Sequence, residues 1–154
     1  MLQKKLLEKI PFFKDFPDEY KEEIVEHSEA ELLKVPPNRS ILSEGEIGDT
    51  CFILLRGSAN VYKRPYSNPL ASLKPGQVFG AVAFLTPRKR TTTVVAEEEC
   101  LLLRLNNQFL DALSHPCRDR FKDQMITVLV RNMETLRATI ERYKAPVITP
   151  NETP

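Results

Sequence analysis

Short apolar runs alternate with turn residues through the middle of the chain. The runs are rich in β-branched and aromatic residues, and Gly, Pro, Asn, Asp or Ser separate them, which is typical of strands. Eight of them occur between Ala30 and Leu105: ELLKV, SIL, TCFILLRG, SANVYKR, LASL, QVFG, TTTVVAEE and CLLLRL. Eight short strands at this regular spacing predict a small all-β roll or sandwich over residues 30–105.

Helical periodicity flanks this β region on both sides. Before it, apolar residues recur at helical spacing, first up to Pro11 and then in a charged amphipathic segment over residues 18–27. After it, Asn106 or Asn107 can cap a further helix. Helices are therefore expected both before and after the roll.

A longer helical pattern follows over residues 118–143. Its apolar residues recur with spacings of 3 and 4, at Ile126, Leu129, Met133, Leu136, Ile140 and Tyr143. This spacing fits the a and d positions of about two and a half heptads, which favours a homodimer through residues 118–143. The alternative is a single apolar stripe that packs on the chain's own core.

The chain has 154 residues, of which 42% are hydrophobic and 28% charged, enough to bury one ordinary core. We expect one domain over residues 1–143, with helices in 1–29, the roll in 30–105 and C-terminal helices in 106–143. Residues 144–154 are proline-rich and polar, so we expect them to be disordered.

The composition excludes several classes of partner. A formal net charge of +1 gives no global attraction to nucleic acid or to anionic lipid. No apolar run approaches the ~20 residues that a membrane-spanning helix needs, and the N-terminus lacks the apolar core of a secretory signal. Only the proline-rich tail follows Tyr143, where a helix-turn-helix would have to stand. We expect a cytoplasmic protein that binds neither DNA nor a membrane.

Candidate catalytic and metal-binding residues are few. Cys51, Cys100 and Cys117 are odd in number and widely spaced, which suits reduced thiols packed in the core, with a redox thiol as the alternative. His27 and His115 fall in helical segments outside the roll, so they cannot form the metal-ligand cluster of a cupin-type enzyme. No Ser, His and Asp arrangement is recognisable. We expect no catalytic residues and no metal.

All five glycines lie in the β region, where several corners need unusual backbone angles. Three segments around them, SEGEIGDTCFILLRGSANVY, SLKPGQVFGAVAFL and RTTTVVA, resemble the cyclic nucleotide-binding domains of protein kinase regulatory subunits, gated ion channels and the bacterial catabolite activator protein. The resemblance runs from about Leu6 to Leu136. It implies an eight-stranded β-roll, a jelly-roll-like double-stranded β-helix, with N-terminal helices and a long C-terminal helix.

The most specific part of the resemblance is the phosphate-binding cassette. The family pattern Phe-Gly-Glu-Leu-Ala-Leu followed by Arg-Ala-Ala-Thr-Val is matched here by Phe-Gly-Ala-Val-Ala-Phe and Arg-Thr-Thr-Thr-Val. Ala81 and Arg90 stand nine residues apart, as in family cassettes without an insertion. Arg88 is a rival, because it follows Pro87 as the family arginine often follows a proline. The implied ligand-binding residues are Phe79, Gly80, Ala81, Val82, Ala83, Arg90, Thr91 and Thr92.

The chemistry of such a site follows from its residue types. Backbone N–H groups at the start of a short helix, near Val82 and Ala83, attract a phosphate. Arg90 can offer two parallel donors to phosphate oxygens, and the Thr91 hydroxyl can add another. Without the cassette spacing, Arg90 would be interpreted as a solvated charge in an exposed Arg-Lys-Arg run. In the family, a threonine after the arginine is associated with cyclic GMP but is compatible with cyclic AMP.

One position departs from the family pattern. The family's glutamate after Phe-Gly hydrogen-bonds the ribose 2′-hydroxyl, and Ala81 stands in its place. Losing a hydrogen bond to a charged group, worth ~1.5–3 kcal/mol, should weaken a cyclic nucleotide about tenfold to a hundredfold. We therefore expect a free-standing sensor or regulatory module that binds cyclic AMP or cyclic GMP weakly and signals to an unidentified effector protein. The alternative is a protein-interaction module that keeps the fold with a different ligand or none.

Overall fold

The computed structural model describes residues 2–26 and 30–143. Three short helices precede the strands: α1 (Lys4–Glu8), the 3-10 helix η1 (Pro11–Phe13) and α2 (Asp18–Glu26). The predicted end of the second helix at His27 and the predicted disorder of 144–154 lie outside the described residues.

Ten strands follow in the described part of the chain, and eight of them correspond to the eight predicted runs. These eight are β1 (Glu31–Val35), β2 (Ser40–Leu42), β4 (Thr50–Arg56), β5 (Ala59–Tyr62), β6 (Ala71–Leu73), β7 (Val78–Phe79), β9 (Thr93–Ala96) and β10 (Cys100–Asn106). They form two four-stranded antiparallel sheets, ordered β1-β10-β4-β7 and β2-β9-β5-β6. The expected β-roll is confirmed.

The sequence missed a third, two-stranded sheet. It pairs β3 (Ile47–Gly48) with β8 (Arg88–Lys89), Ile47 opposite Lys89 and Gly48 opposite Arg88. Each of these strands has two residues, and neither is an apolar pair as Val78–Phe79 of β7 is, so the hydrophobic pattern gave no signal for them.

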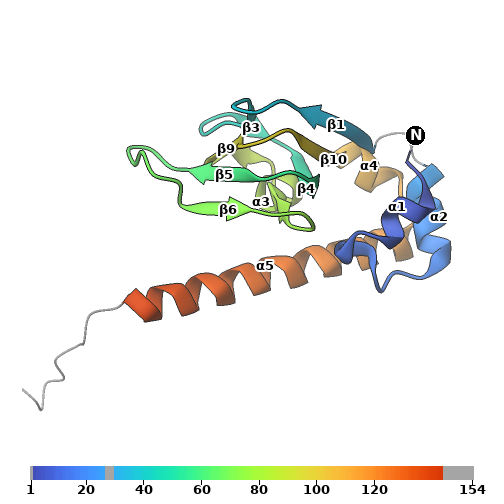
Figure 1. The fold of residues 1–154 in the computed structure, drawn as a ribbon. Coiled ribbons are helices and arrows are strands. Elements are labelled where there is room, and N and C mark those ends of the chain that lie inside the picture. Colours follow the sequence, from blue (N-terminus) through green and yellow to red (C-terminus); the bar gives the residue numbers. More distant parts are fainter. Residues whose placement is uncertain (1, 27–29, 144–154) are drawn as a thin grey trace, which may run out of the picture.

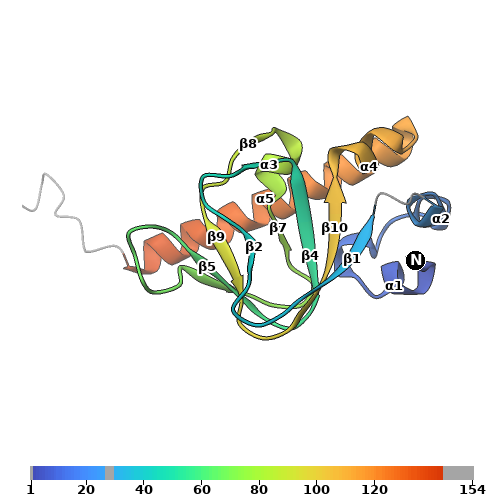
Figure 2. The same ribbon diagram turned by 90° about the horizontal axis from the view of Figure 1, so that it is seen from above.

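Three helices complete the fold. The short α3 (Ala81–Leu85) follows β7, and α4 (Asn107–Ala112) and α5 (His115–Tyr143) follow the last strand. Asn106 is the cap of α4, since its side chain accepts a hydrogen bond from the backbone N–H of Phe109 at 2.9 Å. The N-terminal helices gather at one end of the roll, and α5 runs past the roll from that end (Figures 1 and 2).

Two hydrophobic clusters hold these layers together. The cluster inside the roll contains Leu42, Phe52, Leu54, Ala59, Phe79, Val94, Ala96, Cys100 and Leu102. A larger cluster joins the N-terminal helices, the outer face of β4 and β10, and the helices α3, α4 and α5. Its centre is the ring of Phe121, which packs against five other phenylalanine rings: Phe12, Phe13, Phe16, Phe84 and Phe109.

Only the first part of α5 packs into this cluster. Cys117, Phe121 and Met125 are fully buried, whereas Met133 and Leu136 are 69% and 60% exposed. The interpretation that the whole heptad stripe packs on the chain's own core is therefore wrong for the C-terminal half of the helix. No helix of the described residues is long and apolar enough to cross a membrane.

Candidate functional site

A cavity of about 340 Å³ lies where α3 and the segment after it meet the roll and α5. Its volume is that of a small-molecule pocket. Every residue predicted for the ligand site lines it: Phe79, Gly80, Ala81, Val82, Ala83, Arg90, Thr91 and Thr92. The fold thus brings the two parts of the predicted cassette to one place, and their role in binding stays a prediction.

Gly80 makes the sharp turn from β7 into α3. Its φ of 77° is left-handed, a region that side chains rarely adopt. A Cβ atom there would also lie 2.9 Å from Nη1 of Arg90 and 3.0 Å from the carbonyl oxygen of Thr50. Glycine is therefore needed both for the backbone angle and for the close approach of Arg90.

Arg90 is buried, with 8% of its surface exposed. Its Nη1 donates to the carbonyl oxygen of Gly80 at 3.1 Å, and its Nη2 donates to the carbonyl oxygen of Thr50 at 2.7 Å and to that residue's hydroxyl at 3.0 Å. A Cβ on Gly48 would overlap the Arg90 guanidinium, so Gly48 also makes room for it. The interpretation of Arg90 as a solvated surface charge is wrong.

The pKa of Arg90 is set by its burial and by nearby groups that act against the effect of burial. Burial lowers the pKa of Arg90, while the nearby Cys51, Asp49 and Glu46 act in the opposite direction. An arginine starts from so high a pKa that it stays protonated in proteins. The cavity therefore has a fixed positive charge in its wall, held by backbone carbonyls of β4 and of the β7–α3 turn.

Arg88, the rival in the sequence, has a different environment. It is exposed on β8, and its Nε donates to the carbonyl oxygen of Thr86 at 3.3 Å. It contacts neither Gly80 nor Thr50 through any hydrogen bond within the described residues. The buried contacts of Arg90 favour Arg90 as the arginine that matches the cassette.

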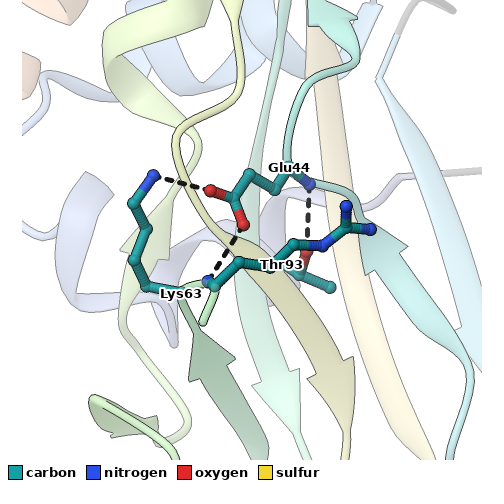
Figure 3. Close-up of polar contacts among 4 residues, drawn as sticks. Glu44, Lys63 and Thr93 are labelled. Carbon is teal, nitrogen blue, oxygen red and sulfur yellow. Dashed lines mark hydrogen bonds and ion pairs between the residues drawn. The ribbon is translucent and has the colours of Figure 1, made fainter. Parts of the chain in front are cut away.

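A network around Glu44 fixes the loop that carries the Arg90 backbone (Figure 3). Its Oε1 accepts from Nζ of Lys63 at 2.6 Å, its Oε2 accepts from the backbone N–H of Arg64, and its own N–H donates to the Thr93 hydroxyl at 2.9 Å. These donors lower the pKa of Glu44, mainly through Lys63. The next residue, Gly45, donates to the Arg90 carbonyl at 2.8 Å. The network therefore ties the turn at Glu44 and Gly45 to the backbone of Arg90 and to Thr93 at the start of β9.

Ala81 is the first residue of α3 and is 6% exposed. It packs in the larger hydrophobic cluster and also borders the cavity. No carboxylate of the described residues lines this cavity. The lining therefore has no charged substitute for the ribose acceptor of the family pattern, and its uncharged polar side chains are Thr91, Thr92 and Asn132.

Sequence reasoning missed the contribution of α5. Leu129 and Asn132 line the cavity from this helix, and Leu42, Val61, Leu73 and Val94 line it from the roll. Leu129 was visible as a member of the heptad stripe, but nothing in the pattern indicated that it faces a cavity. No sequence pattern indicated Asn132 as a residue of the site.

The three cysteines are free and buried. Burial raises the pKa of all three thiols, that of Cys117 to about 12. Thiols held in the neutral form react slowly, which agrees with the core-packing interpretation and not with a redox thiol. Among residues 2–26 and 30–143, no group of three His, Cys, Asp or Glu side chains is placed to hold a metal ion.

Comparisons with known proteins give matches in sequence and in fold. A family model described as the cyclic nucleotide-binding domain matches residues 32–115. A cAMP-dependent protein kinase regulatory subunit of Yarrowia lipolytica is 28% identical over 76% of this chain, which spans 31% of the length of that relative.

Two solved structures show the same fold. The crystal structure of a cyclic nucleotide-binding domain from Methylobacillus flagellatus matches with a TM-score of 0.79 at 20% identity, over 94% of this chain and 84% of the other. The catabolite activator protein of Thermus thermophilus matches with a TM-score of 0.72 at 21% identity, over 85% and 62% of the two chains.

Proposed function

This chain belongs to the cyclic nucleotide-binding domain family, and we propose that residues 1–143 form a regulatory module that binds cyclic AMP or cyclic GMP in the cavity beside Arg90. Binding is weak, because Ala81 cannot accept a hydrogen bond from the ribose 2′-hydroxyl. The module carries out no chemistry, and its signal passes to an effector protein. The related kinase regulatory subunit of Yarrowia lipolytica, named for cAMP dependence, supports this ligand class.

The observation that carries the proposal is the buried guanidinium of Arg90 at a cavity of mononucleotide size. A guanidinium has five N–H donors, and Arg90 makes three hydrogen bonds through two of its nitrogens. Donors are therefore left for a phosphate oxygen, in a site where desolvation strengthens the contact. The bonds to Gly80 and Thr50 hold the guanidinium in place before the ligand arrives.

Restoring the missing acceptor tests this assignment. Ala81→Glu should tighten binding of cyclic AMP or cyclic GMP about tenfold to a hundredfold, the equivalent of ~1.5–3 kcal/mol for a charged hydrogen bond. Calorimetric titration of the natural chain and the variant measures the change. Ala81→Gln is the matched control, since it has nearly the same size without the charge, and it should gain less.

Two results would contradict the proposal. Equal affinities of the folded Glu, Gln and natural proteins would mean that position 81 does not meet the ribose. No heat and no thermal stabilisation with either nucleotide, in both the natural chain and Ala81→Glu, would mean that the module works through protein partners alone.

The exposed stripe of α5 supports a homodimer as part of the same proposal. Met133, Leu136, Ile140 and Tyr143 are 58–80% exposed and border one apolar surface groove. A second copy of the helix can cover this groove by knobs-into-holes packing. In the alternative, a protein-interaction module without a cyclic nucleotide, a partner protein would bind to this same groove.

Leu136→Lys should convert the dimer into a monomer at tens of micromolar protein, because a charge at a d position must be desolvated in the seam. Light scattering gives the molar mass directly. Ala138→Lys, at the f position on the opposite face of the helix, is the control and should remain dimeric. A natural chain that is monomeric, or a Leu136→Lys protein that is still dimeric, would refute the interface.

A further inference from the structure

The wall of the cavity has an unusual charge balance. Three consecutive cations, Arg88, Lys89 and Arg90, line it, and its other lining side chains are apolar or uncharged. None of the carboxylates in the described residues is among them. Glu46 and Asp49, the carboxylates that act on Arg90, line a separate cavity that Arg90 also borders.

The two outer cations differ from Arg90 in being exposed at the mouth of the cavity. Arg88 and Lys89 are exposed on β8, opposite Gly48 and Ile47 of β3. No carboxylate of residues 2–26 and 30–143 forms an ion pair with either of them, whereas Lys63 is paired with Glu44. Their charge is therefore available to a ligand at the mouth of the cavity.

The loss of the family's glutamate has a second effect besides removing a ribose acceptor. A carboxylate at position 81 would repel any further negative charge on the ligand, and Ala81 removes that repulsion. A cyclic nucleotide phosphate is a diester with one negative charge, whereas a terminal phosphate monoester has about two at pH 7. The cation-lined cavity without a carboxylate suits the second kind of ligand better.

We propose that this cavity selects nucleotides with a terminal phosphate monoester, such as a nucleoside 5′-monophosphate, over their 3′,5′-cyclic diesters. The inference rests on the proposed function, since it assigns the ligand of the same cavity. The buried Arg90 holds the phosphate in either case, and Arg88 and Lys89 act on the additional charge. A cavity of about 340 Å³ falls in the range of small-molecule pockets, which suits a single nucleotide.

Calorimetric titration with adenosine 5′-monophosphate and with cyclic AMP, which share base and ribose, tests the inference. At pH 8 the monophosphate should bind about tenfold more tightly, because each partly solvated ion pair adds a modest increment. At pH 5.5, below the second phosphate pKa of about 6, this advantage should fall several-fold. Cyclic AMP has no second phosphate ionisation and serves as the reference at each pH.

Substitutions of Arg88 and Lys89 test whether these two cations cause the tighter binding of the monophosphate. In the double variant Arg88→Ala/Lys89→Ala, the monophosphate should lose most of its advantage, because its affinity should fall by a larger factor than that of the singly charged cyclic AMP. Lys34→Ala/Arg39→Ala is the control, because it removes the same charge from exposed positions outside the cavity lining. Ala81→Glu should reverse the order of the two ligands by returning a carboxylate to the wall.

The outcomes separate the two proposals. Tighter binding of cyclic AMP than of the monophosphate at pH 8 would overturn this inference and leave the proposed function intact. An advantage that survives Arg88→Ala/Lys89→Ala, or that disappears equally in Lys34→Ala/Arg39→Ala, would also overturn it. Binding of neither nucleotide would overturn both.

Discussion

Phe121→Ala should lower the free energy of unfolding by about 3–5 kcal/mol, the usual cost of deleting a large buried aromatic side chain. Phe121 is fully buried at the centre of the aromatic cluster. Its ring centroid lies 5.1 Å from that of Phe12, 5.7 Å from that of Phe109 and 6.0 Å from that of Phe84. These rings belong to η1, α4 and α3, so the substitution leaves a cavity where three elements meet α5.

Urea unfolding followed by circular dichroism measures this loss. Tyr66→Ala is the matched control, since Tyr66 is an aromatic residue that is 67% exposed, and its replacement should change stability by less than about 0.5 kcal/mol. If Phe121→Ala does not fold, Phe121→Leu should still show a smaller loss of about 1–2 kcal/mol. A Phe121→Ala protein within about 1 kcal/mol of the natural chain would refute the role of the cluster.

Arg90→Ala should reduce the affinity for a cyclic nucleotide at least about a hundredfold, whereas Arg88→Ala should leave it within about twofold. The first substitution removes a desolvated charge that can bind a phosphate through two parallel donors, and the second removes an exposed charge. Arg90→Lys should recover only part of the loss, because an ammonium cannot form the bidentate contact.

Calorimetric titration of the three variants decides between the two arginines. The thermal unfolding of each variant must be measured as well, to show that the variant is folded. Arg90→Ala also leaves the carbonyl oxygens of Gly80 and Thr50 without their hydrogen-bond donor. The folded Arg88→Ala protein is the internal control. If Arg88→Ala abolished binding and Arg90→Ala did not, the alignment of the cassette would be wrong by two residues.

The sequence was sufficient for the features that depend on local pattern. Apolar runs bounded by turn residues predicted the eight strands of the two four-stranded sheets, and Asn106 was one of two caps expected for α4. The nine-residue spacing from Ala81 to Arg90 predicted that the two parts of the cassette would meet, and they line one cavity.

The features that were missed depend on tertiary structure. Strands β3 and β8 lack an apolar run, and they are strands because they pair with each other. Leu129 and Asn132 line the cavity because α5 packs along the roll, where Cys117, Phe121 and Met125 bury its first half in the larger cluster. The burial of Arg90 depends on Gly48 and Gly80, which approach it from distant parts of the chain.

The most direct test of the central claim, that a cyclic nucleotide binds in the cavity beside Arg90, is a titration followed by backbone amide shifts in NMR spectra of the ¹⁵N-labelled protein. We predict saturable shifts with cyclic AMP or cyclic GMP at Gly80–Ala83, at Arg90–Thr92 and at Asn132, with little change in the N-terminal helices. An absence of saturable shifts with both nucleotides, or shifts confined to residues 133–143 of α5, would contradict it.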